Sequence, residues 1–251
     1  MEIIERIMPG LSDIEMSRRE HPADWARYEY AATLVEGKRV LDCASGAGYG
    51  SWTLGRAGAQ AVVGVDLAPG AVAWATRNFA LPNVSFRQAS PDRFPLEDGE
   101  VELAVSFETI EHVPEGRAPI FVRELARVLV PRGTLLLSTP LTRGPSRLRP
   151  DNQFHLREYD ENELAALLEP YFVIEKRLGQ HSREAAQFAR AKNARGLRTL
   201  LGSGVHRFVP ARVRAALRER LFGSKDESSP AWITETDWRD APVQMVLARK
   251  R

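Results

Sequence analysis

Short apolar segments alternate with helical segments over most of the 251-residue chain. Parallel strands need long crossover connections, which are usually helices, so this alternation favours an open, mostly parallel α/β sheet with helices on both faces. The near-continuous apolar runs at 101–108 and 133–140 are typical of strands buried on both faces. The predicted strands lie at 38–44, 60–68, 84–90, 101–108, 133–140, 172–178 and 242–250, and the predicted helices at 49–58, 69–80, 114–130 and 160–171.

Two segments do not follow this alternation. Residues 1–36 precede the first strand and contain a helical pattern that ends at Gly37, so we expect an N-terminal helical cap. Residues 37–251 then form the α/β domain. Within it, residues 180–240 separate the last two strands and are expected to be a helical insertion on the substrate side, because long insertions in compact domains are usually functional. The alternatives are packing against the sheet or the interface of a homodimer.

The composition restricts the class of protein. With 43% hydrophobic residues and a net charge of +2, the chain has the composition of a globular protein. No apolar run approaches the roughly 20 residues that a membrane span needs, and the N-terminus does not resemble a signal peptide. Cys43 is the single cysteine, so there is no intramolecular disulfide. We therefore expect a cytoplasmic protein.

Basic residues gather in the later part of the chain. Between residues 177 and 225, twelve Lys and Arg residues stand against only Glu184 and Glu219. The surplus favours an anionic partner, such as a phosphorylated, nucleotide-linked or lipid-linked sugar, unless it forms a solvated helical face. Nucleic acid is not the expected partner, because aromatic residues within the stretch are sparse and no RNA-binding module is recognisable.

The segment VLDCASGAGYG, residues 40–50, places a strand, an acid and a glycine-rich loop in direct succession. Gly46 and Gly48 leave the backbone unobstructed, so a nucleoside ligand can approach it closely. Asp42 would repel a pyrophosphate and suits a ligand with a cationic group. Asp66 ends the next strand, where an acid can accept the two hydroxyls of a ribose. A ribose, a cation and no pyrophosphate describe S-adenosylmethionine and disfavour a dehydrogenase.

These motifs resemble those of the class I S-adenosylmethionine-dependent methyltransferases. The resemblance covers residues 38–140 in order and spacing, and includes the segments FRQASPDRFPLEDGEVELAVSFETIEHV and FVRELARVLVPRGTLLLSTP. It implies a Rossmann-like fold with a seven-stranded sheet whose last strand, at 242–250, is antiparallel. The segments ERIMPG and NQFHLREYDENEL resemble a bacterial subgroup associated with methylation of saccharides, O-antigen-type glycans or natural products.

The resemblance implies a set of cofactor-binding residues. The loop after the first strand would line the methionine moiety and the ribose, and the residues after the fourth strand would lie beneath the cofactor. Ser90 would face the adenine amino group, although the family often has an acid at this position. Arg27 would pair with the methionine carboxylate, with His21 as a second choice. The full expected set is Arg27, Tyr28, Asp42, Ala44, Ser45, Gly46, Gly48, Asp66, Leu67, Ser90, Phe107 and Glu108.

A hydroxyl acceptor calls for a general base, and histidine is the usual candidate. His155 and His112 both follow strands on the ligand side of the expected sheet, and His155 is the favoured base. Glu111 could hold the imidazole of His112 in one tautomer. Glu108, Glu111, His112 and Asp151 could supply ligands to a divalent metal, but the sequence has no metal-binding spacing, so no metal is predicted.

The sequence therefore favours O-methylation of a saccharide or another small-molecule hydroxyl. The alternatives are N-methylation of an amino sugar or natural product, and an RNA methyltransferase that uses the basic 177–225 region. A binding protein that has lost the activity is disfavoured by the intact glycine loop and Asp66.

Overall fold

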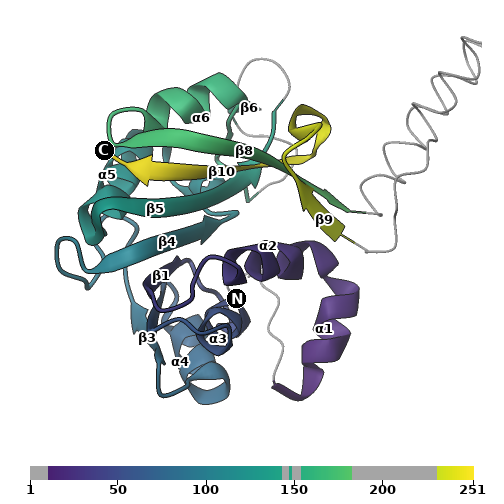
Figure 1. Ribbon diagram of the computed structural model, residues 1–251, viewed down its shortest axis with the longest axis vertical. Coiled ribbons are helices and arrows are strands. Elements are labelled where there is room, and N and C mark those ends of the chain that lie inside the picture. The colour runs from purple at the N-terminus through teal and green to yellow at the C-terminus, as the bar shows by residue number, and fades with distance from the viewer. Residues whose placement is uncertain (1–10, 143–146, 149–153, 183–230) are drawn as a thin grey trace, which may run out of the picture.

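A computed structural model describes residues 11–142, 147–148, 154–182 and 231–251. An eight-stranded sheet in the order β3-β2-β1-β4-β5-β10-β8-β9 forms its centre (Figure 1). The first five strands are mutually parallel, and β10 is antiparallel to both of its neighbours. The strands are β1 (Arg39–Cys43), β2 (Ala61–Asp66), β3 (Val84–Gln88), β4 (Val101–Phe107), β5 (Leu129–Pro140), β8 (Phe172–Ser182), β9 (Ala231–Thr234) and β10 (Val243–Lys250), and a separate hairpin pairs β6 (Arg147–Leu148) with β7 (Arg157–Glu158).

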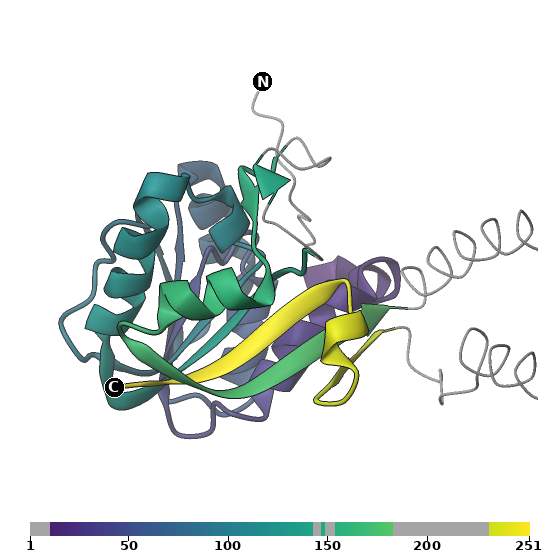
Figure 2. The same cartoon turned by 90° about the horizontal axis from the view of Figure 1, so that it is seen from above.

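Helices cover both faces of the sheet (Figure 2). Successive side chains on a strand point to opposite faces, so Val40 packs with the helices of one face and Leu41 with those of the other. The face of Val40 carries α2 (Pro22–Ala32), α3 (Tyr49–Arg56) and α4 (Pro69–Phe79), and the face of Leu41 carries α5 (Ala118–Val128) and α6 (Glu161–Leu168). The predicted α/β alternation is thus confirmed.

The sheet has one strand more than the seven that the family resemblance implied. The additional strand, β9, pairs antiparallel with the end of β8. Within the expected helical insertion at 180–240, residues 180–182 complete β8, residues 231–234 form β9, and Trp238–Asp240 form a short 3-10 helix. Residues 183–230, which carry most of the basic surplus, lie outside the described residues, as does Asp151.

The N-terminal segment packs against the domain as helices. A short helix, α1 (Ile14–Glu20), leads into α2, which contacts α3, β8 and β9. The approach of α2 to α3 requires Gly50, because a Cβ atom at this position would lie 2.0 Å from Cζ of Tyr28. The described part of the expected cap, residues 11–36, thus lies on the sheet beside the strand ends. Among the described residues, no helix is long and apolar enough to cross a membrane.

The N-terminus of α6 carries a complete capping box. The Asp160 side chain accepts hydrogen bonds from the backbone N–H groups of Asn162 and Glu163, at 2.7 and 2.9 Å. The Glu163 side chain in turn accepts from the backbone N–H of Asp160 at 3.2 Å. This reciprocal arrangement satisfies donors that the first turn of a helix leaves without partners.

Replacing Asp160 by alanine should therefore lower the free energy of unfolding by about 1 kcal/mol, which chemical denaturation would measure. Asp160→Asn is the matched control, because asparagine caps helices about as well as aspartate. Equal stability of the alanine variant and the wild-type protein would show that the cap contributes nothing.

Candidate active site

A cavity of about 490 Å³ opens where the parallel strands β1, β2 and β4 end. Its volume is within the range of small-molecule sites, about 300–1,000 Å³. Ligands of open α/β sheets bind beyond the carboxyl ends of the strands, which is where this cavity lies. Its walls are formed by Asp24, Arg27, Tyr28, Cys43, Ala44, Ser45, Gly46, Ala47, Tyr49, Val65, Asp66, Leu67, Ala89, Pro91, Phe94, Phe107, Glu108, Thr109, His112, Val113 and Phe154.

The loop after β1 is held by Asp66 at the end of β2. One carboxylate oxygen of Asp66 accepts from the backbone N–H of Gly46, and the other from that of Ala68, each at 2.9 Å. Gly46 has a φ of 53°, and a Cβ added there would meet no atom within 4 Å, so its missing side chain leaves open space. Ala44 also has a positive φ, 58°, which is uncommon for a residue with a side chain and typical of functional loops.

Gly48 serves the packing of the loop rather than the cavity. It has a φ of 93°, and a Cβ there would lie 2.6 Å from Cβ of Ala75 and 2.8 Å from the Phe86 ring. The glycine therefore allows the loop to approach α4 and β3 closely. The sequence predicted Gly48 as a cofactor-binding residue, but Gly48 is not among the described residues that form the cavity wall.

The expected adenine side of the cavity is apolar. Leu67 lines it and is 61% exposed, which makes it one of the few large apolar side chains open to solvent in the described part of the chain. Ala89, Pro91 and Phe94 line the same cavity. Ser90 does not, because its hydroxyl accepts from the backbone N–H of Asp92 at 3.3 Å within a turn.

Helix α2 supplies one wall through Asp24, Arg27 and Tyr28. The Arg27 guanidinium is buried, donates from Nη1 to Oε1 of Gln180 at 2.7 Å, and pairs with Asp24. Its Nε atom is buried without a hydrogen-bond partner. The Tyr28 ring packs edge-on against Phe107, with 5.1 Å between the ring centroids. The expected contribution of Arg27 and Tyr28 to the cavity wall is therefore present.

Asp42 lies behind the cavity wall rather than in it. Its side chain is fully buried and accepts from the hydroxyls of Ser51 at 2.6 Å and Tyr28 at 3.2 Å. Burial raises the pKa of this carboxyl to about 7, against the lowering effect of the two hydrogen bonds. The expected contact with a cationic ligand group is therefore not made directly. Asp42 instead anchors Tyr28 by accepting its hydroxyl hydrogen bond. Asp42 itself lies inside the sheet, where β1 pairs it with Gly64 of β2 and Val105 of β4.

The raised pKa of Asp42 makes stability depend on pH. The folded state holds a proton that the unfolded chain releases near the ordinary value of 3.8, so this contribution to stability is lost as the pH rises toward 7. Relative to Asp42→Asn, the wild-type free energy of unfolding should fall by about 2–3 kcal/mol between pH 5 and pH 8. Denaturant titrations at both pH values test this.

Asp98→Asn is the control for that measurement. A hydrogen bond from Arg127 lowers the pKa of Asp98. The small contribution of the Asp98 carboxylate to stability is therefore lost as the pH falls, which is the opposite direction to that expected for Asp42. If Asp42→Asn and the wild-type protein showed the same dependence on pH, the buried carboxyl would not retain its proton.

Two glutamates and a histidine follow β4, and a second histidine lies beside them. Glu108 lines the cavity, has a φ of 47°, and accepts from the Ser138 hydroxyl at 2.7 Å. Glu111 is fully buried, and burial and the charge of Glu108 raise its pKa well above the ordinary value. His112 lines the cavity, and the rings of His112 and His155 are 5.1 Å apart at their centroids. The structure therefore brings together the three predicted catalytic residues, Glu111, His112 and His155.

The two histidines are fixed by different partners. Nδ1 of His112 lies 2.9 Å from the backbone carbonyl of Phe154, which can only accept, so this nitrogen carries the proton. Nδ1 of His155 lies 2.9 Å from a carboxylate oxygen of Glu158. His155 is not among the described residues of the cavity wall, whereas its neighbour Phe154 is.

Several residues of the site carry no recognisable signal in the sequence. Asp24 lies one helical turn before Arg27, so its pairing with the guanidinium follows from the helix once α2 is placed. Tyr49, Phe94 and Phe154 reach the cavity only through the tertiary fold. Cys43 lines the cavity, yet burial raises the pKa of its thiol well above the ordinary value, as for a small buried apolar residue.

Comparison with protein families finds a methyltransferase domain over residues 40–133. A ubiquinone biosynthesis O-methyltransferase of Xanthomonas euvesicatoria pv. vesicatoria is 35% identical over 168 residues, which cover 59% of this chain and 68% of that protein. A probable S-adenosylmethionine-dependent methyltransferase of Mycolicibacterium smegmatis is 36% identical over 178 residues, 70% of this chain and 66% of the relative. The chain thus spans slightly less than two thirds of the length of that mycobacterial relative.

Solved structures agree on the fold. The [4+2]-cyclase SpnF has a TM-score of 0.59 and 20% identity, over 92% of this chain and 80% of its own. A Burkholderia thailandensis 1,6-didemethyltoxoflavin-N1-methyltransferase with bound S-adenosylhomocysteine has a TM-score of 0.56 and 18% identity, over 95% and 86%. At these identities the likeness shows the fold alone, which hosts more than one reaction. The sequence relatives show more: the chain belongs to the class I S-adenosylmethionine-dependent methyltransferases.

Proposed function

We propose that the protein transfers the methyl group of S-adenosylmethionine to a hydroxyl oxygen of a small molecule, with saccharides as the acceptor class. One observation carries the proposal: a single cavity has the Asp66 loop in its wall together with His112 of the Glu111–His112–His155 cluster. The Xanthomonas relative is an O-methyltransferase, which supports the same acceptor atom. Resemblance of the segments at 5–10 and 152–164 to saccharide methyltransferases supports the acceptor class.

The cavity fits S-adenosylmethionine on three counts. Asp66 lies in the cavity wall at the end of β2, where a carboxylate can accept the hydroxyls of a ribose. Leu67 offers an exposed apolar surface for the adenine ring. Within the described part of the chain, the buried Nε of Arg27 has no hydrogen-bond partner, and a carboxylate such as that of the methionine moiety would satisfy it.

The chemistry then requires alignment and removal of one proton. When bound, S-adenosylmethionine supplies a methyl group on a positively charged sulfur, which needs no further activation. The protein has to hold the acceptor hydroxyl in line with that methyl group and accept its proton. With the proton of His112 on Nδ1, its Nε2 carries the lone pair that can accept. His155, oriented by Glu158, is the second imidazole at the same place.

The surrounding segments are proposed to select the acceptor. Residues 1–36 and 180–240 would cover the acceptor side, and the basic residues of 177–225 would favour an anionic acceptor. Ser90 would contribute to the adenine side through its turn. N-methylation of an amino sugar would use the same alignment, but an amine that is already deprotonated needs no base for its attack.

Methyl transfer from labelled S-adenosylmethionine to a panel of sugars, lipid-linked glycan precursors, amino sugars and RNA tests the proposal. Transfer to a saccharide hydroxyl is expected, with mass spectrometry locating the methyl group on oxygen. Transfer to RNA alone, or to nitrogen alone, would overturn the acceptor assignment. Absence of cofactor binding at millimolar concentration in calorimetry would overturn the enzymatic function itself.

A further inference from the structure

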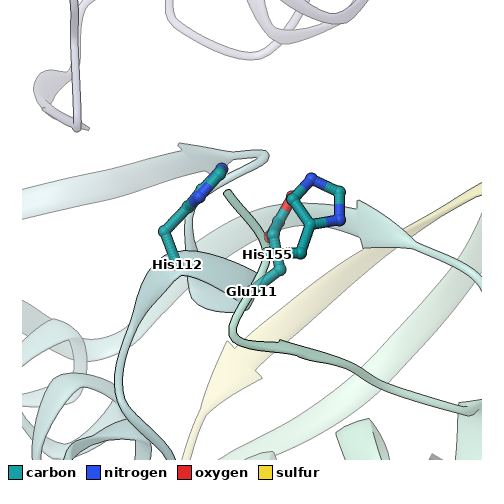
Figure 3. A group of neighbouring side chains, drawn as sticks. All are labelled: Glu111, His112 and His155. Atoms are coloured by element: carbon teal, nitrogen blue, oxygen red, sulfur yellow. The ribbon is translucent and has the colours of Figure 1, made fainter. Parts of the chain in front are cut away.

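Three potential metal ligands converge beside the cavity. Glu111 and His112 belong to the short turn Ile110–His112 after β4, and His155 comes from the segment before β7 (Figure 3). One ligand atom from each side chain lies within 4.8 Å of the other two. A carboxylate and two imidazoles form a ligand set used by catalytic zinc sites, which keep one position open for water or substrate.

Only one of the two oxygens of the Glu111 carboxylate accepts a side-chain hydrogen bond within the described part of the chain. Its side chain is fully buried, and one oxygen accepts from the Thr139 hydroxyl at 2.9 Å. The other oxygen is buried and has no hydrogen-bond partner among the residues that the structure describes. Leaving a carboxylate oxygen buried in this way costs free energy, and a bound cation would remove that cost.

Both histidines are oriented in the way typical of metal ligands. In metal sites, the ring nitrogen that does not bind the metal usually donates to a backbone carbonyl or a carboxylate, which fixes the tautomer and the ring. His112 donates from Nδ1 to the carbonyl of Phe154, and Nδ1 of His155 pairs with Glu158. Each imidazole thus has one of the two partner types that support a coordinating histidine.

We propose that Glu111, His112 and His155 bind one divalent transition cation, such as Zn²⁺, Co²⁺ or Mn²⁺, which holds the acceptor hydroxyl. The role of the ion rests on the proposed O-methylation, whereas the binding site itself does not. Ligand atoms that are each about 2.1 Å from an ion in tetrahedral geometry lie about 3.4 Å apart, so ligand atoms separated by as much as 4.8 Å have to approach one another by up to about 1.4 Å. His112 is exposed and can make this adjustment.

The cation would take over the work of a general base. A hydroxyl bound to it at an open coordination position has a lowered pKa, so its proton can leave to solvent water before the oxygen attacks the methyl carbon. His112 lines the cavity, so a ligand on the open side of the ion would face the bound cofactor. The sequence predicted no metal because His155 lies 43 positions after His112, a separation that forms no short binding motif.

Binding of Co²⁺ to the full-length, metal-free protein tests the site directly. Visible absorption and calorimetry, without cofactor or acceptor, should show one equivalent bound. Co²⁺ affinity should fall by at least about 10–100-fold in each of the variants His112→Ala, His155→Ala and Glu111→Gln. A loss of this size already follows when a residue that only hydrogen-bonds to a metal ligand is mutated, and these three residues are proposed as direct ligands. Glu175→Gln is the matched control, because Glu175 pairs with Arg249 on the surface of β8.

Metal binding and methyl transfer can fail separately. If the wild-type protein binds no Co²⁺, or the three variants bind it as tightly as the wild-type protein, the metal proposal is wrong even if transfer occurs. If Co²⁺ binds and the variants lose it, the site is established even if no hydroxyl acceptor is methylated. A role for the ion in transfer further requires that chelation abolish activity and that added Co²⁺ or Mn²⁺ restore it; activity that persists after chelation would overturn that role.

Discussion

Replacing His112 or His155 by alanine is expected to lower the turnover number by about 10²–10⁴-fold while leaving the affinity for S-adenosylmethionine nearly unchanged. Both imidazoles belong to the cluster proposed to activate the acceptor, whereas the residues expected to hold the cofactor lie on the Asp66 loop and on α2. Steady-state kinetics with a confirmed acceptor, together with calorimetry of cofactor binding, separates the two effects.

A pair of variants at Glu158 controls for the orientation of His155. Glu158→Gln keeps an acceptor for Nδ1 of the imidazole, whereas Glu158→Ala removes it. The alanine variant should therefore lose more turnover than the glutamine variant. If a histidine variant loses affinity for the cofactor but keeps its turnover number, that histidine belongs to the cofactor site and does not activate the acceptor.

Asp66→Ala is expected to weaken binding of S-adenosylmethionine by about 1.5–3 kcal/mol, or about 10–150-fold in Kd. Part of the loss is the proposed pair of hydrogen bonds to the ribose. The rest comes from the loop, since Asp66 also accepts the backbone N–H groups of Gly46 and Ala68. Calorimetric titration of the folded variant with the cofactor measures the total.

Asp98→Ala provides the comparison for Asp66. Asp98 is 80% exposed and pairs with Arg127 at the surface, where such pairs contribute little to stability. Its removal should leave cofactor affinity unchanged. Equal affinities of Asp66→Ala and the wild-type protein would rule out the ribose role and leave Asp66 with the loop alone.

Prediction from the sequence succeeded where the pattern is local. The alternation of strands and helices gave the parallel sheet, because apolar periodicity directly reports which faces are buried. The N-cap of α6 could be identified because Asp160 and Glu163 interact within one helical turn. The glycine loop and Asp66 were recognisable because strand order places the ends of neighbouring strands together.

Prediction from the sequence was less successful where the role of a residue depends on how deeply its side chain is buried in the tertiary structure. Asp42 lies one residue before the end of β1 and Asp66 ends β2, yet Asp42 is buried behind Tyr28 and Ser51, whereas Asp66 reaches the cavity. Gly46 and Gly48 belong to the same glycine-rich motif, so the sequence gives them the same predicted role. Of the two, Gly46 faces open space, whereas Gly48 packs closely against its neighbours. The strand β9 was missed because it pairs with β8, from which the long segment 183–230 separates it in the sequence.

The sequence by itself thus determined the α/β class, the position of the cofactor loop and the identity of the residues that could act as acid, base or ligand. Only the tertiary structure decided which of these residues meet. Glu111, His112 and His155 converge because the segment before β7 packs against the turn after β4, where the backbone N–H of Leu156 donates to the carbonyl of Glu111 at 2.8 Å. One Glu111 oxygen is buried there without a hydrogen-bond partner among the described residues. Side-chain convergence and burial arise from long-range packing, which local periodicity does not encode.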